Sequence, residues 1–248
     1  MEPEAATPEP CFLRSERSPA FARYCERVYG RMLNQDGTAD MEQLDLLVRV
    51  LGLGPGSRAL DAGCGTGITT AYLAETTGAD FTGIDSSEVA IRRARQLAEA
   101  GPHRLRFEVG TMDALGLPAA SFDAVIAIES LYFPKDLPGT IGQFKALLRP
   151  GGQMGLFFTH LGPASAVSPD QTKLGQALQA NGIAFQAHAL TDQDRRFWQR
   201  SRDAAEALRA EFDAEGNFDL AHLGETTAVL DLIGKGGHAR HLYHARLP

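Results

Sequence analysis

The sequence predicts an α/β fold in which a doubly wound parallel sheet is covered by helices on both faces. Predicted strands and helices alternate from residue 58 onward, and a glycine-rich turn follows the first of these strands. The length of 248 residues suits one large core with an elaboration better than two equal domains. We therefore expect one domain with additions to a shared core.

Composition and charge narrow the class of protein. No apolar run approaches the roughly 18 residues that cross a bilayer, so no membrane partner is expected. A net charge of -7 without a dense Lys/Arg run disfavours nucleic acid, because affinity for nucleic acid rests on clustered cations. The cysteines lack a CxxC pair and are odd in number, which favours a reducing compartment, and we expect the cytoplasm.

The first 54 residues are expected to form a tail and two helices. The opening MEPEAATPEP carries three Glu and three Pro and lacks the features of a secretory signal, which predicts a disordered tail over residues 1–18. Apolar spacing predicts a helix over residues 20–33. A second helix follows a cap at Thr38 or Asp40 and ends in the GLGPG segment at 52–56.

Residues 55–190 carry the alternation of strands and helices that predicts the core. Strands are expected over 58–62, 80–84, 105–109, 123–128, 153–158 and 183–190. Helices are expected over 66–77, 87–100, 137–148 and 172–180. This βαβ order is typical of a parallel sheet with both faces covered.

A helical cap is expected over residues 191–236, before a last strand over 237–248. In a charged helix of the cap, one apolar stripe is formed by Phe197, Ala204, Leu208 and Phe212. The helical spacing makes the two phenylalanines expected core residues. The ending HARHLYHARL alternates with a period of two, which predicts a strand.

The segment RALDAGCGTG, residues 58–67, combines a strand, an acid and a glycine-rich turn. Glycines allow a tight turn and close approach of a ligand to the backbone, and they stand at Gly63, Gly65 and Gly67. The dinucleotide fingerprint fails because its third glycine falls on Ile68, and the Lys-Ser/Thr pair of a phosphate loop is absent. The negative charge of Asp61 suits a cationic amino group better than a pyrophosphate.

Asp85 ends the next predicted strand in the segment TGID. A carboxylate there can accept two hydrogen bonds from a ribose diol. As an alternative, Asp85 or Ser86 could cap the following helix. The acid lies 22 residues after Gly63, close to the spacing of about 20 that is expected when loop and acid share one ligand, and this favours ligand binding.

Five motifs together carry a family resemblance: LDAGCGTG, TGID, VGTMDALGLP, FDAVIAIESLYF and LRPGG. In their order and spacing over residues 44–158, the chain resembles the class I S-adenosylmethionine-dependent methyltransferases. The resemblance implies a Rossmann-like sheet of seven strands, S-adenosylmethionine as cofactor, S-adenosylhomocysteine as product and no metal.

The resemblance also implies which residues bind the cofactor: Asp61, Gly63, Cys64, Gly65, Gly67, Asp85, Ser86, Met112, Asp113 and Glu129. In the family pattern the first acid and the loop glycines face the methionine part, and Asp85 holds the ribose. Met112 and Asp113 flank the adenine, although Asp113 could be a plain turn residue. Glu129 and Ser130 line the cleft, and we assign Cys64 no chemical role.

Methyl transfer needs a nucleophile held about 3 Å from the methyl carbon, so a dedicated base is optional. His160 is the first candidate base because it follows a predicted strand at the carboxyl edge of the sheet, where ligands bind. Glu129 is its rival. Tyr24, Tyr29 and Tyr132 are expected to line the substrate site with His160, although aromatic residues also form ordinary cores.

The expected function is methyl transfer to O, N or C of a small metabolite, such as one of specialised biosynthesis. ESLY stands where members that modify amides or bases carry an NPPY-type tetrapeptide, and the cysteines are poorly arranged for arsenic methylation. Cyclisation or isomerisation on the same fold, or cofactor binding without catalysis, are the alternatives. A nicotinamide oxidoreductase is disfavoured by the missing third glycine, and the chain is expected to be a monomer or homodimer.

Overall fold

The computed structural model describes residues 11–31, 33, 37–101, 104–162, 168–221 and 223–248. Its centre is a seven-stranded sheet in the order β3-β2-β1-β4-β5-β7-β6, which confirms the predicted fold class. The strands are β1 Arg58–Ala62, β2 Asp80–Asp85, β3 Leu105–Val109, β4 Phe122–Ala127, β5 Leu148–Leu161, β6 Phe185–Ala189 and β7 His238–Arg246. Neighbours are parallel from β3 to β5, and β7 is antiparallel to both β5 and β6.

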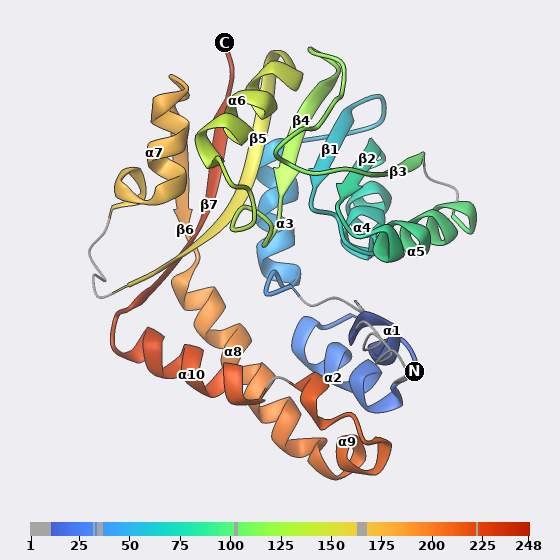
Figure 1. Ribbon diagram of the computed structural model, residues 1–248. Coiled ribbons are helices and arrows are strands. Elements are labelled where there is room, and N and C mark those ends of the chain that lie inside the picture. Colours follow the sequence, from blue (N-terminus) through green and yellow to red (C-terminus); the bar gives the residue numbers. More distant parts are fainter. Residues whose placement is uncertain (1–10, 32, 34–36, 102–103, 163–167, 222) are drawn as a thin grey trace, which may run out of the picture.

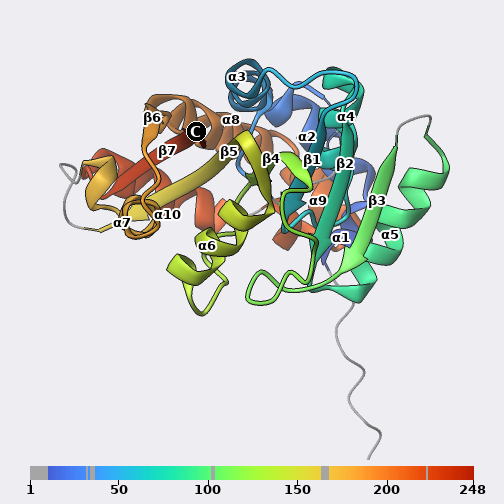
Figure 2. The same ribbon diagram turned by 90° about the horizontal axis from the view of Figure 1, so that it is seen from above.

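Helices cover both faces of this sheet. They are α3 Met41–Leu51, α4 Ile68–Thr77, α5 Glu88–Glu99, α6 Leu137–Leu147 and α7 Lys173–Ala180, with the short turn η1 Pro169–Gln171 before the last. Helices α3 and α4 lie on one face and α6 and α7 on the other (Figure 2). The expected doubly wound arrangement is therefore present.

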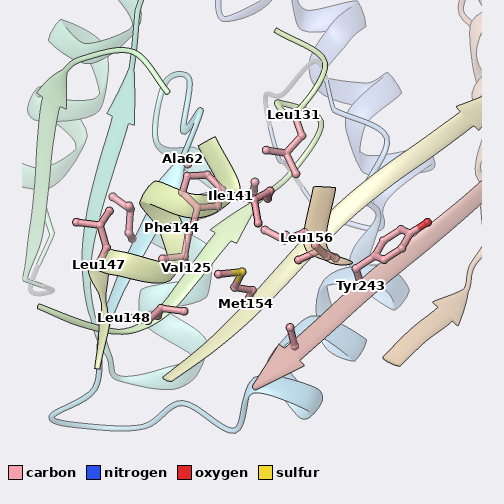
Figure 3. Packing of buried hydrophobic residues seen from close by; sticks show 14 of the residues in the cluster. Ala62, Val125, Leu131, Ile141, Phe144, Leu147, Leu148, Met154, Leu156 and Tyr243 are labelled. Atoms are coloured by element: carbon pink, nitrogen blue, oxygen red, sulfur yellow. The ribbon is translucent and has the colours of Figure 1, made fainter. Parts of the chain in front are cut away.

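The face under α6 and α7 holds an extensive buried apolar cluster (Figure 3). Its members come from both helices and from β1, β4, β5 and β7, and they include Val125, Ile141, Phe144, Met154, Leu156 and Tyr243. Full burial of each large apolar side chain stabilises the fold by about 1.5–3 kcal/mol. This packing gives the loops at the carboxyl ends of the strands a rigid base.

A second body of helices lies beyond the carboxyl ends of the parallel strands and is called the cap below (Figure 1). It consists of α1 Cys11–Ser15, α2 Pro19–Tyr29, α8 Thr191–Ala207, α9 Arg209–Glu215, η2 Phe218–Ala221 and α10 Leu223–Gly234. Phe197 and Phe212 are buried in its core, as the helical spacing predicts. The cap therefore combines the N-terminal helices with the segment between β6 and β7.

The tail prediction is wrong where the structure can test it. Residues 1–10 lie outside the described residues, but residues 11–15 form α1. Two contacts distant in sequence hold this region: Arg14 Nη1 donates to Asp219 at 3.2 Å, and Arg93 Nε donates to Glu16 at 3.1 Å. The composition of residues 1–18 does not reveal contacts with residues so far away in the sequence.

Several element boundaries also differ from the prediction, each for a local reason. Helix α2 ends at Tyr29 because Gly30 adopts a left-handed conformation with φ 73°. Of the two possible caps of α3, Asp40 accepts from the backbone of Gln43. Ser87, rather than Asp85 or Ser86, caps α5, and the predicted charged helix divides at Leu208 into α8 and α9.

Within the described residues, no helix is both long and apolar enough to cross a bilayer.

Candidate active site

The glycine-rich turn after β1 is held against the ends of β2 and β4. The backbone amides of Gly63 and Cys64 donate to the carbonyl of Ile84 at 2.7 and 3.1 Å. Gly63 has φ +86°, and a Cβ atom there would lie 2.3 Å from Cβ of Ser130. Ser130 in turn donates from Oγ to the carbonyl of Ala62 at 2.6 Å. Only glycine fits this position, because a side chain is excluded by both conformation and space.

Asp61 is a buried acid beneath this turn, with 3% of its surface exposed. It accepts a hydrogen bond from Oγ1 of Thr70 at 2.6 Å. Burial, together with the charge of Asp85, raises the pKa of Asp61 to about 6 despite that hydrogen bond. A cation bound beside Asp61 would favour the ionised carboxylate, so the site is chemically suited to an ammonium group.

Asp85 closes the turn from the other side. Its two carboxylate oxygens accept from the backbone amides of Gly65 and Ser87 at 2.9 and 2.8 Å. These bonds orient the carboxylate and leave lone pairs for a ligand. The same acid therefore braces the glycine-rich turn and lines a cavity.

Two cavities meet at this turn. The first, of about 380 Å³, is lined by Asp85, Ser86, Met112 and Asp113 among others. The second, of about 250 Å³, is lined by Asp61, Cys64 and Gly65, with Phe12 and Gly37 from the N-terminal segment. Gly63 and Glu129 line both, so the two cavities adjoin. We call them the cofactor cavities.

Two other positions in the turn have distinct roles. A Cβ atom on Gly67 would lie 2.6 Å from the ring of Phe107, so this glycine permits close packing of the turn. Burial and the carboxylates of Asp61 and Asp85 raise the pKa of the Cys64 thiol far above its ordinary value. Cys64 therefore stays a neutral thiol in the cavity wall.

The loop with Met112 and Asp113 is held by α6. Gln143 Nε2 donates to the carbonyl of Met112 at 3.2 Å, and its Oε1 accepts from the amide of Leu115 at 3.0 Å. Asp113 accepts from the amide of Lys135 at 2.9 Å. Sequence reasoning missed Gln143, because nothing in its local pattern reveals a partner about 30 residues earlier.

A third cavity, of about 730 Å³, is lined by Tyr132 and His160, together with apolar side chains such as Leu131 and Phe158. The Tyr132 hydroxyl accepts from the backbone amide of Thr159 at 2.8 Å. Burial and the nearby Glu129 carboxylate raise the pKa of Tyr132 to about 12, so its phenol stays protonated at neutral pH. Two residues predicted to bind the substrate thus come together in one cavity.

The other two tyrosines lie in or beside the cap core. Tyr24 packs against Phe21 and Phe212. The Tyr29 hydroxyl donates to the carbonyl of Gly37 at 2.7 Å and so supports one wall of the second cofactor cavity. The assignment of Tyr24 and Tyr29 to substrate binding stays a prediction. The observed contacts of Tyr24 are packing contacts.

A buried arginine beside Glu129 is the main feature that sequence reasoning missed. Arg240, on β7, is 1% exposed and forms an ion pair with Oε1 of Glu129. Its guanidinium also donates to Oε1 of Gln43 at 2.8 Å and to Oγ1 of Thr159 at 3.1 Å. Oδ1 of Asp194, on α8, lies 3.5 Å from Nε of Arg240. The period-two pattern of residues 237–248 predicts that the segment is a strand, but it does not predict the ion pair of Arg240 with Glu129.

Among the described residues, no group of three or more His, Cys, Asp or Glu side chains is arranged to hold a metal ion.

The fold and the site define a class of protein. An antiparallel β7 between β5 and β6, a glycine-rich turn after β1 and an acid ending β2 are the features of a Rossmann-like methyltransferase fold. The sequence profile of the family described as "Methyltransferase domain" matches residues 59–152. This match confirms the predicted resemblance of the core to class I S-adenosylmethionine-dependent methyltransferases.

Individual proteins are similar to this chain over different lengths. The 27-O-demethylrifamycin SV methyltransferase of Amycolatopsis mediterranei is 35% identical over 148 residues, which cover 55% of this chain and 54% of that protein. The chain spans about a third to a half of the length of the curated relatives it matches.

Two solved structures share the fold. Phosphoethanolamine N-methyltransferase 2 of Haemonchus contortus has a TM-score of 0.77 at 19% identity, covering 96% of this chain and 59% of its own. The cyclase SpnF has a TM-score of 0.68 at 24% identity, covering 84% of this chain and 80% of its own.

Proposed function

We propose that this chain is an S-adenosylmethionine-dependent methyltransferase that transfers a methyl group to O, N or C of a small molecule. One observation carries the proposal: the two adjoining cofactor cavities bring Asp61, Asp85 and Asp113 around a turn that has no room for a side chain at Gly63. A nucleoside linked to an amino acid needs such a set of hydrogen-bond acceptors along its length.

The residues present fit the cofactor chemically. The buried carboxylate of Asp61 suits the ammonium group, and Asp85 offers acceptor oxygens to the ribose diol. A Cβ atom on Gly65 would meet nothing within 4 Å, so the backbone of this turn is open to the cavity. The joint size of the cavities is typical of small-molecule sites of about 300–1,000 Å³.

When bound, the cofactor supplies an electrophilic methyl group on a sulfonium. The chain contributes positioning, and Phe12 and Phe133 add apolar surface to the cavity walls. We assign the acceptor to the cavity with Tyr132 and His160. His160 is the proposed proton acceptor, since Glu129 is already engaged by Arg240.

The test is isothermal titration of wild type and Asp85→Ala with S-adenosylmethionine and S-adenosylhomocysteine. We expect micromolar binding by wild type and at least tenfold weaker binding by the variant, about 1.4 kcal/mol. Asp80→Ala is the matched control, because it removes a carboxylate at the opposite end of the same strand. Absence of binding by folded wild type would refute the proposal.

Non-methylating chemistry is the second candidate, supported by the likeness of the fold to the cyclase SpnF. Mass spectrometry of reactions with a panel of small acceptors separates the two. Methyl transfer replaces a proton of the acceptor with a methyl group, a net gain of CH₂ in mass, and releases one S-adenosylhomocysteine for each product. Cyclisation or isomerisation changes the acceptor without consuming the cofactor, and a non-catalytic protein binds the cofactor and changes neither.

A further inference from the structure

The buried charges around Arg240 join four elements that are far apart in sequence. Glu129 follows β4, Gln43 lies on α3, Asp194 lies on α8 and Arg240 lies on β7. Asp194 also accepts from Nε1 of Trp198 at 3.2 Å, and its Oδ2 lies 2.5 Å from Nε2 of His238. The cluster therefore connects the cap to the cleft.

A guanidinium that is 1% exposed is costly to bury unless its charge is matched and its N–H groups are paired. The charge of Arg240 is matched by the carboxylates of Glu129 and Asp194, and its Nε and Nη1 donate to Gln43 and Thr159, while Nη2 is held by its ion pair with Glu129. The two hydrogen bonds hold the planar guanidinium in one orientation, with Nη2 directed at Glu129. Such a group orients the acids beside it.

Glu129 is the partner that reaches the site. Its backbone has φ +55°, a left-handed conformation that side-chain-bearing residues rarely adopt and that tends to occur at functional sites. Its side chain remains 22% exposed and lines both cofactor cavities. One oxygen of this carboxylate is paired with Arg240 while the residue forms the wall shared by the two cavities.

We propose that Arg240 is a positioning residue, which holds the Glu129 carboxylate at the point where the two cofactor cavities meet. Asp194 links Arg240 to the cap, so the orientation of the Glu129 carboxylate depends on the position of α8. The inference rests on the proposed function, because it takes the ligand of these cavities to be the cofactor. It gives Glu129 the role of a fixed acceptor in the cleft rather than that of a mobile base.

The test is a double-mutant cycle on S-adenosylhomocysteine affinity, measured by titration calorimetry. Arg240→Lys keeps the charge but loses the planar fork. We expect it to weaken binding at least threefold when residue 129 is Glu. In the Glu129→Gln background the same substitution should change affinity by less than 1.5-fold, because its effect passes through the carboxylate.

A merely structural role predicts a different pattern. Arg240→Lys would then weaken binding equally in both backgrounds, or in neither, and either result overturns the inference. Asp194→Asn provides a second variant that leaves Arg240 in place, and it should weaken binding about twofold only when Glu129 is present. Unchanged affinity in Asp194→Asn overturns the connection to the cap.

Arg149→Gln serves as the control for losing an ion pair elsewhere in the sheet, because Arg149 pairs with Asp123 at 2.9 Å outside the cofactor cavities. It should leave affinity unchanged. Failure of wild type to bind S-adenosylhomocysteine counts against the proposed function itself. Binding by wild type with additive effects in the cycle counts only against the role of Arg240.

Discussion

The two sides of the cleft are built in different ways. The cofactor side is assembled from short segments at the ends of neighbouring strands, where Asp61 and Asp85 lie on β1 and β2 and Gly63 lies in the turn after β1. The cap is joined to the cleft through Glu129 and Arg240, which are 111 residues apart in the chain and meet only in the folded protein. Local chemistry therefore specifies the first side, and packing specifies the second.

The largest expected effect is on the free energy of unfolding, and it tests whether the cap can be destabilised without changing ligand affinity. Phe212 is fully buried in the cap core, and Phe212→Ala should lower the free energy of unfolding by about 3–5 kcal/mol, because it leaves a cavity. Denaturant titration measures this loss. S-adenosylhomocysteine affinity should change less than threefold, since the cofactor side keeps its own contacts.

Phe144→Ala is the matched substitution on the other side. Phe144 is equally buried, but it lies on α6 next to Gln143, which holds the loop of Met112. We expect a similar loss of stability together with clearly weaker ligand binding. Equal effects of both substitutions on affinity would show that the two sides are not separable.

A smaller effect sharpens the account of the cofactor side. Gly63→Ala should cost about 3 kcal/mol of stability, because it combines a left-handed backbone with a Cβ atom 2.3 Å from Ser130. Gly116→Ala has a similar φ of +63° but meets nothing within 4 Å, so it should cost about 1–2 kcal/mol. Equal losses in thermal denaturation would mean that space at Gly63 is unimportant.

The smallest effect concerns protonation of Asp61. Because its folded-state pKa is raised to about 6, the acid adds stability to the free protein at low pH, and this stability is lost as the pH rises through 6. Binding of an ammonium group needs the ionised acid. As the pH increases toward 6, S-adenosylhomocysteine affinity should therefore rise by up to about tenfold per pH unit, and above pH 6 it should level off.

Asp61→Asn should remove both dependences and weaken binding at neutral pH. Calorimetry between pH 5 and 8, with wild type and variant in the same buffers, measures the change. A wild-type affinity that is flat across this range would contradict the assignment of the ammonium group to Asp61.

The sequence predicts which glycines and acids gather at the turn after β1, because residues at strand ends act through short-range geometry. Gly63, Asp85 and Met112 are found around adjoining cavities as their positions suggest. The burial of Arg240 could not be predicted, because the period-two pattern predicts a strand but does not show that an arginine on it is buried beside Leu242. Its partners become visible only when β7 is placed between β5 and β6.

The antiparallel pairing of β6 and β7 has a consequence for how the cap is attached. Ala189 pairs with His241, and the amide of Leu190 donates to the carbonyl of Arg240 at 2.8 Å. The segment between β6 and β7 thus leaves and re-enters the sheet at neighbouring positions, like a long loop grafted onto a hairpin. Since the entropy of closing a loop grows slowly with its length, this segment can be exchanged for another without disturbing the strands that carry Asp61 and Asp85.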